Sequence, residues 1–363
     1  MRSEFVVAAK EFKDNLNSKR FLILFGLLTL LSIIGAITGI SSYNSDLATY
    51  NSNLNQVSSL PGGMKIFVDM PSILSIFSSY GTYIASFGML LAISMGFDLI
   101  SREKEEGTLK ILLTHPVFRD QVINGKILGA AAMMTVVLLS TFMAIVAIML
   151  FFGIVPTGDD LIRLVAFFLA VVLFLLAYLA IAVMSSTISK SSSMAMLIAI
   201  AIVLVGMVIP NVSSAVADVA LGQAPQATIV STSGSTTTGG LTVTTFQAFA
   251  GNQTGGNQTG RGTPMEINPE YTDYWNKRNQ ITGIINVISP SNDFDAISQV
   301  ITGRLSSPTQ GSADQGFFKR LSGETVSVWD SLASVWTNFL ALIVMIVIGF
   351  GVSYAKFVRV DVR

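Results

Sequence analysis

Residues Asp98–Lys126 read D-L-I-S-R-E-K-E-E-G-T-L-K-I-L-L-T-H-P-V-F-R-D-Q-V-I-N-G-K, and they separate two apolar runs of membrane-spanning length. Charged side chains bracketed by such runs must lie in water beside the bilayer, because an unpaired charge in hydrocarbon is costly. Their concentration at one point predicts a docking surface for a soluble partner. This stretch therefore indicates both the membrane class of the chain and its first candidate functional surface.

The composition of the 363-residue chain is that of an integral membrane protein. Hydrophobic residues make up 51% of the chain and charged residues 12%, against roughly 25% charged in a soluble domain. The 22 basic and 22 acidic side chains cancel, which argues neither for a nucleic-acid binder nor for a polyacidic tail. There is no cysteine, so disulfides, thiolate metal sites and cysteine nucleophiles are excluded.

Six apolar segments have, or nearly have, the length of a helix that crosses a hydrocarbon core about 30 Å thick. Backbone groups in lipid need internal hydrogen-bond partners, so these segments are predicted to be helices. We therefore expect an all-α integral membrane protein with six transmembrane helices. The expected spans are Phe21–Ile40, Ser72–Phe97, Ile127–Phe152, Leu161–Met184, Met194–Ile209 and Leu332–Tyr354.

Basic residues predict the orientation of these spans, because lysine and arginine concentrate in cytoplasmic loops. They cluster before the first span, in the charged stretch and after the sixth span, whereas the opposite short loops are nearly bare. Both termini and the charged stretch are therefore predicted to be cytoplasmic, in a cell (plasma) membrane. The expected regions are an interfacial helix (1–20), spans one to five (21–210) with the charged segment 98–126, an external Thr/Gly-rich domain (211–330), and span six with a cytoplasmic tail (331–363).

The residues before the first span predict an amphipathic helix. Phe5, Ala9, Phe12 and Leu16 recur at spacings of four, three and four, and charged residues occupy the other faces. Such a helix would lie in the cytoplasmic interface of the membrane. It is expected either to anchor the chain or to contact a partner.

The external segment between spans five and six changes character along its length. Thr228–Thr263 is rich in Thr, Gly, Ser and Asn, which predicts a flexible loop or a weak hairpin between T-I-V-S-T and L-T-V-T-T-F. Asn252 and Asn257 begin N-x-T sequons and are candidate glycosylation sites. From Pro269 onward, helical spacing predicts short amphipathic helices that pack on the outer ends of the spans.

Residues needed for several kinds of chemistry are absent from the sequence. No stretch reads G-x-x-x-x-G-K-[ST], so the chain has no P-loop for ATP. His115 is the single histidine and is expected to be a loop or interface residue, so no metal site and no catalytic residue are predicted. The spans carry almost no carboxylates, which disfavours an ion-coupled transporter and a membrane-embedded enzyme.

Asp98–Gly129 resembles the hallmark segment of ABC-2-type permeases, and most of all the branch related to the permease of the nitrous-oxide-reductase maturation transporter. Members share a pattern close to R-E-[KR]-E-x-G-T-[LI]-x-x-L-L-x-x-P-[VI]-x-R-x-x-x-x-x-G-K, and Arg102–Lys126 matches it nearly completely. The closing segment Lys356–Arg363 resembles the charged tail of archaeal members. The long Thr/Gly-rich loop departs from the compact members of the family.

The resemblance implies a permease subunit of an ATP-driven transporter, acting as an exporter. Two such subunits, expected to form a homodimer in the lipid bilayer, would bind a separate ABC ATPase subunit that carries ATP and Mg²⁺. This chain would bind no cofactor and no nucleic acid. The charged stretch would supply the family's coupling helix, and the resemblance assigns that interface to Arg102, Glu103, Glu105, Glu106, Gly107, Thr108, Arg119 and Lys126.

Two small-residue motifs, Gly35-x-x-x-Gly39 and Ala92-x-x-x-Gly96, permit close helix contacts within the subunit or across the dimer. The alternative to a permease is a membrane scaffold that anchors a glycosylated external domain. The scaffold predicts that function survives loss of the charged stretch. The permease predicts a neighbouring gene for an ATPase with a P-loop.

Overall fold

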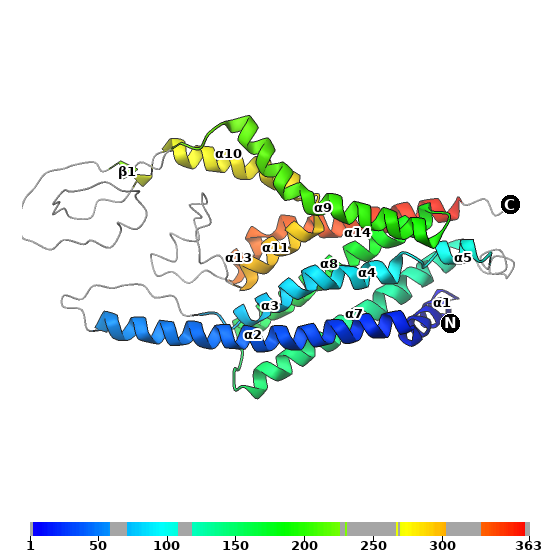
Figure 1. Ribbon diagram of the computed structural model, residues 1–363, viewed down its shortest axis with the longest axis horizontal. Helices are drawn as coiled ribbons and strands as arrows, with labels where there is room; N and C mark the ends of the chain where they lie inside the picture. The colour runs from blue at the N-terminus through cyan, green and yellow to red at the C-terminus, as the bar shows by residue number, and fades with distance from the viewer. Residues whose placement is uncertain are drawn as a thin grey trace, which may run out of the picture.

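A computed structural model shows the chain as an elongated bundle of helices (Figure 1). Apart from one pair of two-residue strands, the regular structure of the described residues is helical, which confirms the predicted all-α class. The structure describes residues 3–58, 71–107, 118–225, 229–230, 266–267, 269–302 and 328–359.

Six helical segments in the described part of the chain are long and apolar enough to cross a membrane, which confirms the predicted number of spans. The amphipathic leader forms α1 (Ser3–Asn17), as its pattern predicts. The leader, α5 (Ser101–Glu105) and the end of the last helix lie at the same end of the bundle (Figure 1). The spanning segments are α2 (Lys19–Ser58), Ser75–Glu105, α7 (Arg119–Phe151), α8 (Gly158–Ile188), α9 (Ser192–Leu221) and α14 (Trp336–Val358).

The second span contains a π-helical turn. It consists of α3 (Ser75–Tyr83), the π turn η1 (Ile84–Gly88) and α4 (Met89–Gly96), and it leads into α5. A Cβ atom on Gly88 would lie 3.1 Å from the side chain of Leu175, so the turn is pressed closely against α8. Turns of this kind occur frequently at functional positions.

Both predicted small-residue motifs lie at helix contacts inside this chain. Cβ atoms on Gly35 and Gly39 of α2 would lie 2.9 and 2.6 Å from atoms of α3. In the second motif Ala92 is fully buried, and a Cβ atom on Gly96 would lie 2.7 Å from Ala182 of α8. Small residues let the helix backbones approach one another here, as they do in other membrane bundles.

The helix of the first span continues far beyond the apolar residues that predicted it. The apolar run ends near Ile40, but α2 continues through polar residues to Ser58, and Figure 1 shows this part projecting past the bundle. Hydroxyl groups there bond back to the helix; Thr49 Oγ1, for example, donates to the Ser45 carbonyl at 3.0 Å. Hydropathy indicates where lipid contact ends, and a helix can continue into water.

The fifth span also passes its predicted end, and it does so through a proline. Pro210 lies inside α9, where it removes one backbone hydrogen bond and bends the helix. Figure 1 shows the change of direction along α9. The Ser213 hydroxyl donates to the Pro210 carbonyl at 2.9 Å. The helix ends at Leu221, and the next residue, Gly222, has a φ of 72° that favours glycine.

The centre of the bundle is α8. Its side chains Phe167, Phe174 and Tyr178 are buried, and it packs against α4, α9, α14 and α11 (Pro290–Thr302). The approach of α14 is close, because a Cβ atom on Gly349 would lie 2.8 Å from Ala180 of α8. The dense packing around α8 supplies the van der Waals contact that holds helices together in lipid.

Between α9 and α14, the helices α10 and α11 form a hairpin that enters the bundle. Its first helix, α10 (Pro269–Asn286), is attached to the end of α9 by Tyr274, whose hydroxyl donates to the Gly222 carbonyl at 2.9 Å. The turn after α10 brings Ser289 beside Gly206, near the midpoint of α9. The hairpin of α10 and α11 therefore reaches deeper than the predicted packing on the outer ends of the spans.

The predicted hairpin of the Thr/Gly-rich loop is described only in part. The T-I-V-S-T segment contributes β1 (Ile229–Val230), which pairs antiparallel with β2 (Glu266–Ile267). The predicted partner segment Leu241–Phe246 lies outside the described residues. The same holds for the two candidate glycosylation sites, Asn252 and Asn257.

Candidate functional site

The short helix α5 follows the second span, at the end of the bundle where α1 also lies. A side chain of another helix stabilises the start of α5. The Ser186 hydroxyl of α8 accepts from the backbone N–H groups of Ile100 and Ser101, at 3.0 and 2.9 Å. The helix ends at Glu105, and Gly107 has a φ of 72°. The helical pattern from Ser101 to Leu113 predicts an interruption at Gly107, and the left-handed φ of this glycine agrees with that prediction.

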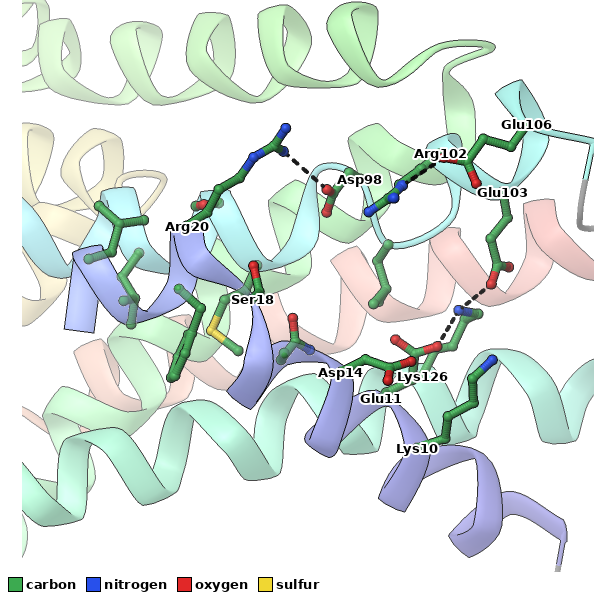
Figure 2. Close-up of a pocket in the computed structure, with 17 residues that line it drawn as sticks. Lys10, Glu11, Asp14, Ser18, Arg20, Asp98, Arg102, Glu103, Glu106 and Lys126 are labelled. Carbon is green, nitrogen blue, oxygen red and sulfur yellow. Dashed lines mark hydrogen bonds and ion pairs between the residues drawn. The ribbon is translucent and has the colours of Figure 1, made fainter. Parts of the chain in front are cut away.

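A buried lysine of α7 forms ion pairs with α1 and with α5. Lys126 of α7 is 3% exposed, and its Nζ lies 2.5 Å from Glu11 Oε1 of α1 and 2.8 Å from Glu103 Oε1 of α5 (Figure 2). The two carboxylates are 14% and 23% exposed. Short charge-assisted contacts of this kind hold their partners in one geometry. The Lys126 cluster (Glu11, Glu103, Lys126) therefore ties the leader helix and α5 to the third span.

A glycine motif on α7 explains why α1 can lie so close to it. Cβ atoms on Gly125 and Gly129 would lie 2.7 Å from Val7 and from the Ala8 carbonyl oxygen of α1. The spacing Gly125-x-x-x-Gly129 is the same signal that the sequence analysis used for Gly35 and Ala92, so it was open to prediction and was missed. The amphipathic leader α1 thus packs on α7 at the positions of these two glycines.

Two further side chains of α5 reach the short loop between α8 and α9. Lys104 Nζ donates to the carbonyl oxygens of Thr187 and Ser189 at the end of α8. Glu105 Oε2 accepts from the backbone N–H of Ser192 at the start of α9, at 3.0 Å. A cation at a helix C-terminus and an anion at a helix N-terminus both complement the helix dipole. Sequence reasoning assigned no role to Lys104, whose partners are backbone atoms distant in sequence.

The outward face of α5 carries an exposed ion pair. Arg102 Nε donates to Glu106 Oε1 at 2.9 Å, and the two side chains are 65% and 49% exposed. Glu106 therefore faces Arg102, whereas Glu103 turns inward to Lys126. The spacing of Glu103 and Glu106 predicts one shared helix face with Lys110; the structure separates the two glutamates, and Lys110 lies outside the described ranges.

A cavity of about 630 Å³ opens beside this face, between α1, the start of α2, α4 and α5. Figure 2 shows charged side chains of both signs around it, with the ion pair of Arg20 and Asp98 at 3.6 Å on one side. Apolar residues such as Phe21 and Met95 also line it. The cavity is therefore lined by both charged and apolar side chains.

Of the remaining predicted interface residues in the described part of the chain, Gly107 follows α5 closely and Arg119 lies on α7. Arg119 begins α7, and its guanidinium donates to the Val358 carbonyl at the end of α14, at 3.5 Å. Thr108 and His115 lie outside the described residues. In the part of the chain that is described, no group of three or more histidine or carboxylate side chains is placed to hold a metal ion. The structure thus groups five of the predicted residues, Arg102, Glu103, Glu105, Glu106 and Lys126, around one helix.

Residues 5–362 match the model of the ABC-2 family transporter proteins. The chain is also similar to the probable ABC transporter permease protein NosY of Pseudomonas aeruginosa, with 30% identity over 163 residues, 45% of this chain and 50% of that protein. The NosY protein of Stutzerimonas stutzeri is 27% identical over 142 residues, 39% of this chain and 44% of that protein. The chain thus matches about half the length of these curated relatives.

Proposed function

This chain belongs to the ABC-2 family of transporter proteins, and on that basis we propose that it is the permease subunit of an ATP-driven exporter. It is a multi-pass membrane subunit, and two copies are proposed to form the transport unit in the plasma membrane. A separate ABC ATPase chain would bind Mg²⁺ and ATP and would dock on the α5 end of each copy. Binding and hydrolysis of ATP there would bias the bundle between two arrangements.

The distribution of basic residues supports a cytoplasmic position for the α5 end. In the described part of the chain, lysines and arginines gather at this end, as expected for the cytoplasmic side. The opposite end holds Arg163, Lys277 and Arg278 among the described residues. Basic residues at the α5 end are Lys10, Lys13, Lys19, Arg20, Arg102, Lys104, Arg119, Lys126, Lys190, Lys356 and Arg359.

The single observation that carries the proposal is the way successive side chains of α5 hold different helices. Glu103 binds Lys126 of α7, and Lys104 and Glu105 bind the end of α8 and the start of α9. The Lys126 cluster adds α1. A push on α5 would therefore be passed to four helices at once, which is what a coupling element between an ATPase and a membrane bundle must do. The exposed pair Arg102 and Glu106 is left for the partner.

Removal of the exposed pair tests the docking proposal. We expect Arg102→Ala together with Glu106→Ala to reduce co-purification of the ATPase chain at least about tenfold, because charge-assisted bonds across the interface are lost. The fold should be unaffected, since exposed ion pairs contribute little to stability. The measurement is the amount of ATPase recovered with the tagged permease from native membranes.

The chain provides a matched control for this experiment. Lys277 and Asp273 form an equivalent exposed pair on α10, at 2.8 Å, at the other end of the bundle. Lys277→Ala together with Asp273→Ala should leave ATPase recovery unchanged. If this pair matters as much as the pair on α5, the docking surface has been placed on the wrong side.

A second variant separates docking from transmission. Lys104→Met together with Glu105→Ala should preserve ATPase recovery but remove most of the effect of the permease on the ATPase rate. The reason is that α5 would no longer hold the α8–α9 loop. The ATPase rate of the assembled complex is compared with that of the isolated ATPase. Lys190→Met, an exposed lysine in the same loop, is the control, and equal loss of rate control in both variants would contradict the role of the clamp.

A further inference from the structure

The turn between α10 and α11 lies beside the middle of α8 and of α9. Phe294 of α11 stacks on Phe174, with ring centroids 4.6 Å apart, and Phe174 is near the midpoint of α8. The Ser291 hydroxyl lies 2.5 Å from the Tyr178 hydroxyl of the same helix. Together with Ser289 beside the midpoint of α9, these contacts seat the start of α11 deep within the bundle.

This seated turn carries a fully buried carboxyl group. Asp293 is 0% exposed; its Oδ1 accepts from Asn338 Nδ2 of α14 at 2.8 Å, and its Oδ2 has no protein hydrogen-bond partner among the described residues. Two other buried oxygen atoms in the same turn, Asn286 Oδ1 and Ser289 Oγ, also have no protein hydrogen-bond partner there. The buried Asn292 Nδ2 of this turn also has no partner there, so the turn holds both unpaired donors and unpaired acceptors beside the carboxyl.

Charged neighbours do not compensate this carboxyl in the described structure. Arg163 of α8 donates to Ser331 of α13 (Val328–Ser334), at 3.4 Å, and the Tyr178 hydroxyl of α8 pairs with Ser291. On α11 itself Asp295 is exposed and accepts from Gln299. The titratable or charged residues on the helices packed against α11 are Tyr80 and Tyr83 on α3, Asp159, Asp160, Arg163 and Tyr178 on α8, Asp218 on α9, Asp330 on α13, and Tyr354 and Lys356 on α14.

An isolated carboxylate is unfavourable in such a position. A buried charge without an opposite charge tends to be neutralised, and a carboxyl group is neutralised by binding a proton. Burial raises the pKa of the Asp293 carboxyl to about 7, and the Asn338 hydrogen bond offsets only part of that rise. Once protonated, the carboxyl loses its charge and gains an O–H donor.

We propose that Asp293 is a proton-binding site, and that binding of the proton stabilises the packing of the α10–α11 hairpin within the bundle. The proton binds one carboxylate oxygen, with no other bond made or broken, and it is released when the hairpin leaves the seat and the carboxyl meets water. The ATP-driven cycle of the permease is not needed for this equilibrium. The site makes the outer part of the bundle sensitive to pH.

The direction of the pH effect follows from the raised pKa. The seated hairpin binds the proton more tightly than the released hairpin, in which the carboxyl has its ordinary pKa of about 4. Seating is therefore favoured most at low pH, and this preference is lost as the pH rises from about 4 to about 7. Above that range no further change is expected. One proton allows at most a tenfold change in the equilibrium for each pH unit.

Thiol labelling of the full chain in lipid nanodiscs tests the proposal. The natural sequence has no cysteine, so a single reporter can be introduced as Ser298→Cys on the buried face of α11. Its rate of reaction with a maleimide is divided by that of Thr49→Cys, an exposed position on α2, to correct for thiol ionisation. We expect the corrected rate to rise at least about tenfold between about pH 5 and about pH 8.

The same labelling measurement on two carboxyl variants shows whether Asp293 is responsible for the pH dependence. Asp293→Asn resembles the protonated form, so its corrected rate should stay low and change less than about twofold with pH. Asp295→Asn, which removes the exposed carboxyl on the same helix, should behave as the unmodified chain does. The proposal is overturned if Asp293→Asn retains the full pH dependence, or if the unmodified reporter shows none.

An infrared measurement keeps the proposal testable if a labelling variant folds poorly. The carbonyl stretch of a protonated carboxylic acid should be present at low pH, should disappear as the pH rises through about 7, and should be missing in Asp293→Asn. A pH-dependent band that is identical in the chain with and without Asp293 would assign the proton to another group and contradict the proposal.

Discussion

Replacement of Lys126 by methionine is expected to destabilise the end of the bundle that carries α5 by about 3–5 kcal/mol. The lysine is 3% exposed, and its ammonium group is the shared partner of Glu11 and Glu103. Without it, two largely buried carboxylates face each other, and relief requires α1 or α5 to move away. We therefore expect lower thermal stability in detergent and loss of ATPase co-purification in the same variant.

Two comparisons show whether the effect comes from the unpaired charges. Lys10→Met changes an exposed lysine on α1, beside the same cavity, and should alter stability by less than about 0.5 kcal/mol. The triple variant Glu11→Gln, Glu103→Gln and Lys126→Met removes the charges together and should recover part of the loss. If Lys126→Met is as stable as the unmodified chain, the cluster does not hold the three helices together.

Replacement of Gly129 by valine should push α1 off the third span. A Cβ atom at this position would lie 2.7 Å from the Ala8 carbonyl oxygen and 2.8 Å from Glu11 Cβ, and backbone atoms cannot rotate aside. Overpacking of this kind costs about 1–3 kcal/mol. Because α1 carries Glu11, the contact with Lys126 is expected to be lost as well. Hydrogen exchange of the α1 amides is the measurement, and their protection should fall.

The same substitution at a second helical glycine is the control. Gly26 lies on α2, and a Cβ atom there would have no atom within 4 Å. Gly26→Val should therefore leave the protection of α1 unchanged, although it makes the same chemical change in a helix. Equal protection of α1 in both variants would show that close packing at Gly129 does not position the leader.

The sequence predicts the spans because the hydrophobicity of neighbouring residues adds up over a segment, whatever their order. Runs such as Leu161–Met184 need only apolar length, and this run lies within α8 as observed. The ends are less predictable, since α2 continues through polar residues to Ser58 and α9 continues through Pro210. In both cases the helix is set by backbone hydrogen bonds and tertiary contacts, while hydropathy reports only the apolar part.

The candidate site is predictable in its residue types but not in its contacts. The family pattern indicates the charged residues of α5, yet their separate partners emerge only when distant helices meet. Lys104 binds carbonyl groups more than eighty positions away, at Thr187 and Ser189, and carbonyl groups leave no trace in a side-chain pattern. The Gly125-x-x-x-Gly129 motif, by contrast, was visible in the sequence.

Asp293 illustrates a different limit of sequence reasoning. Its surroundings, Ser289-Pro290-Ser291-Asn292-Asp293, have the composition of an exposed turn and helix start, so an outer position was predicted. The structure seats this turn at the midpoint of α8 instead. Polar residues can be buried where neighbouring helices supply partners, such as Tyr178 for Ser291 and Asn338 for Asp293. Those partners lie on other elements and cannot be inferred from local composition.

Site-specific photo-crosslinking in native membranes tests the central claim most directly. A photoreactive amino acid is placed at Arg102, on the exposed face of α5, and in a separate variant at Thr49, on the projecting end of α2. We expect Arg102 to capture a chain containing the G-x-x-x-x-G-K-[ST] motif of an ATPase and Thr49 not to capture it. Capture of that ATPase from Thr49, with none from Arg102, would contradict the proposed docking on α5.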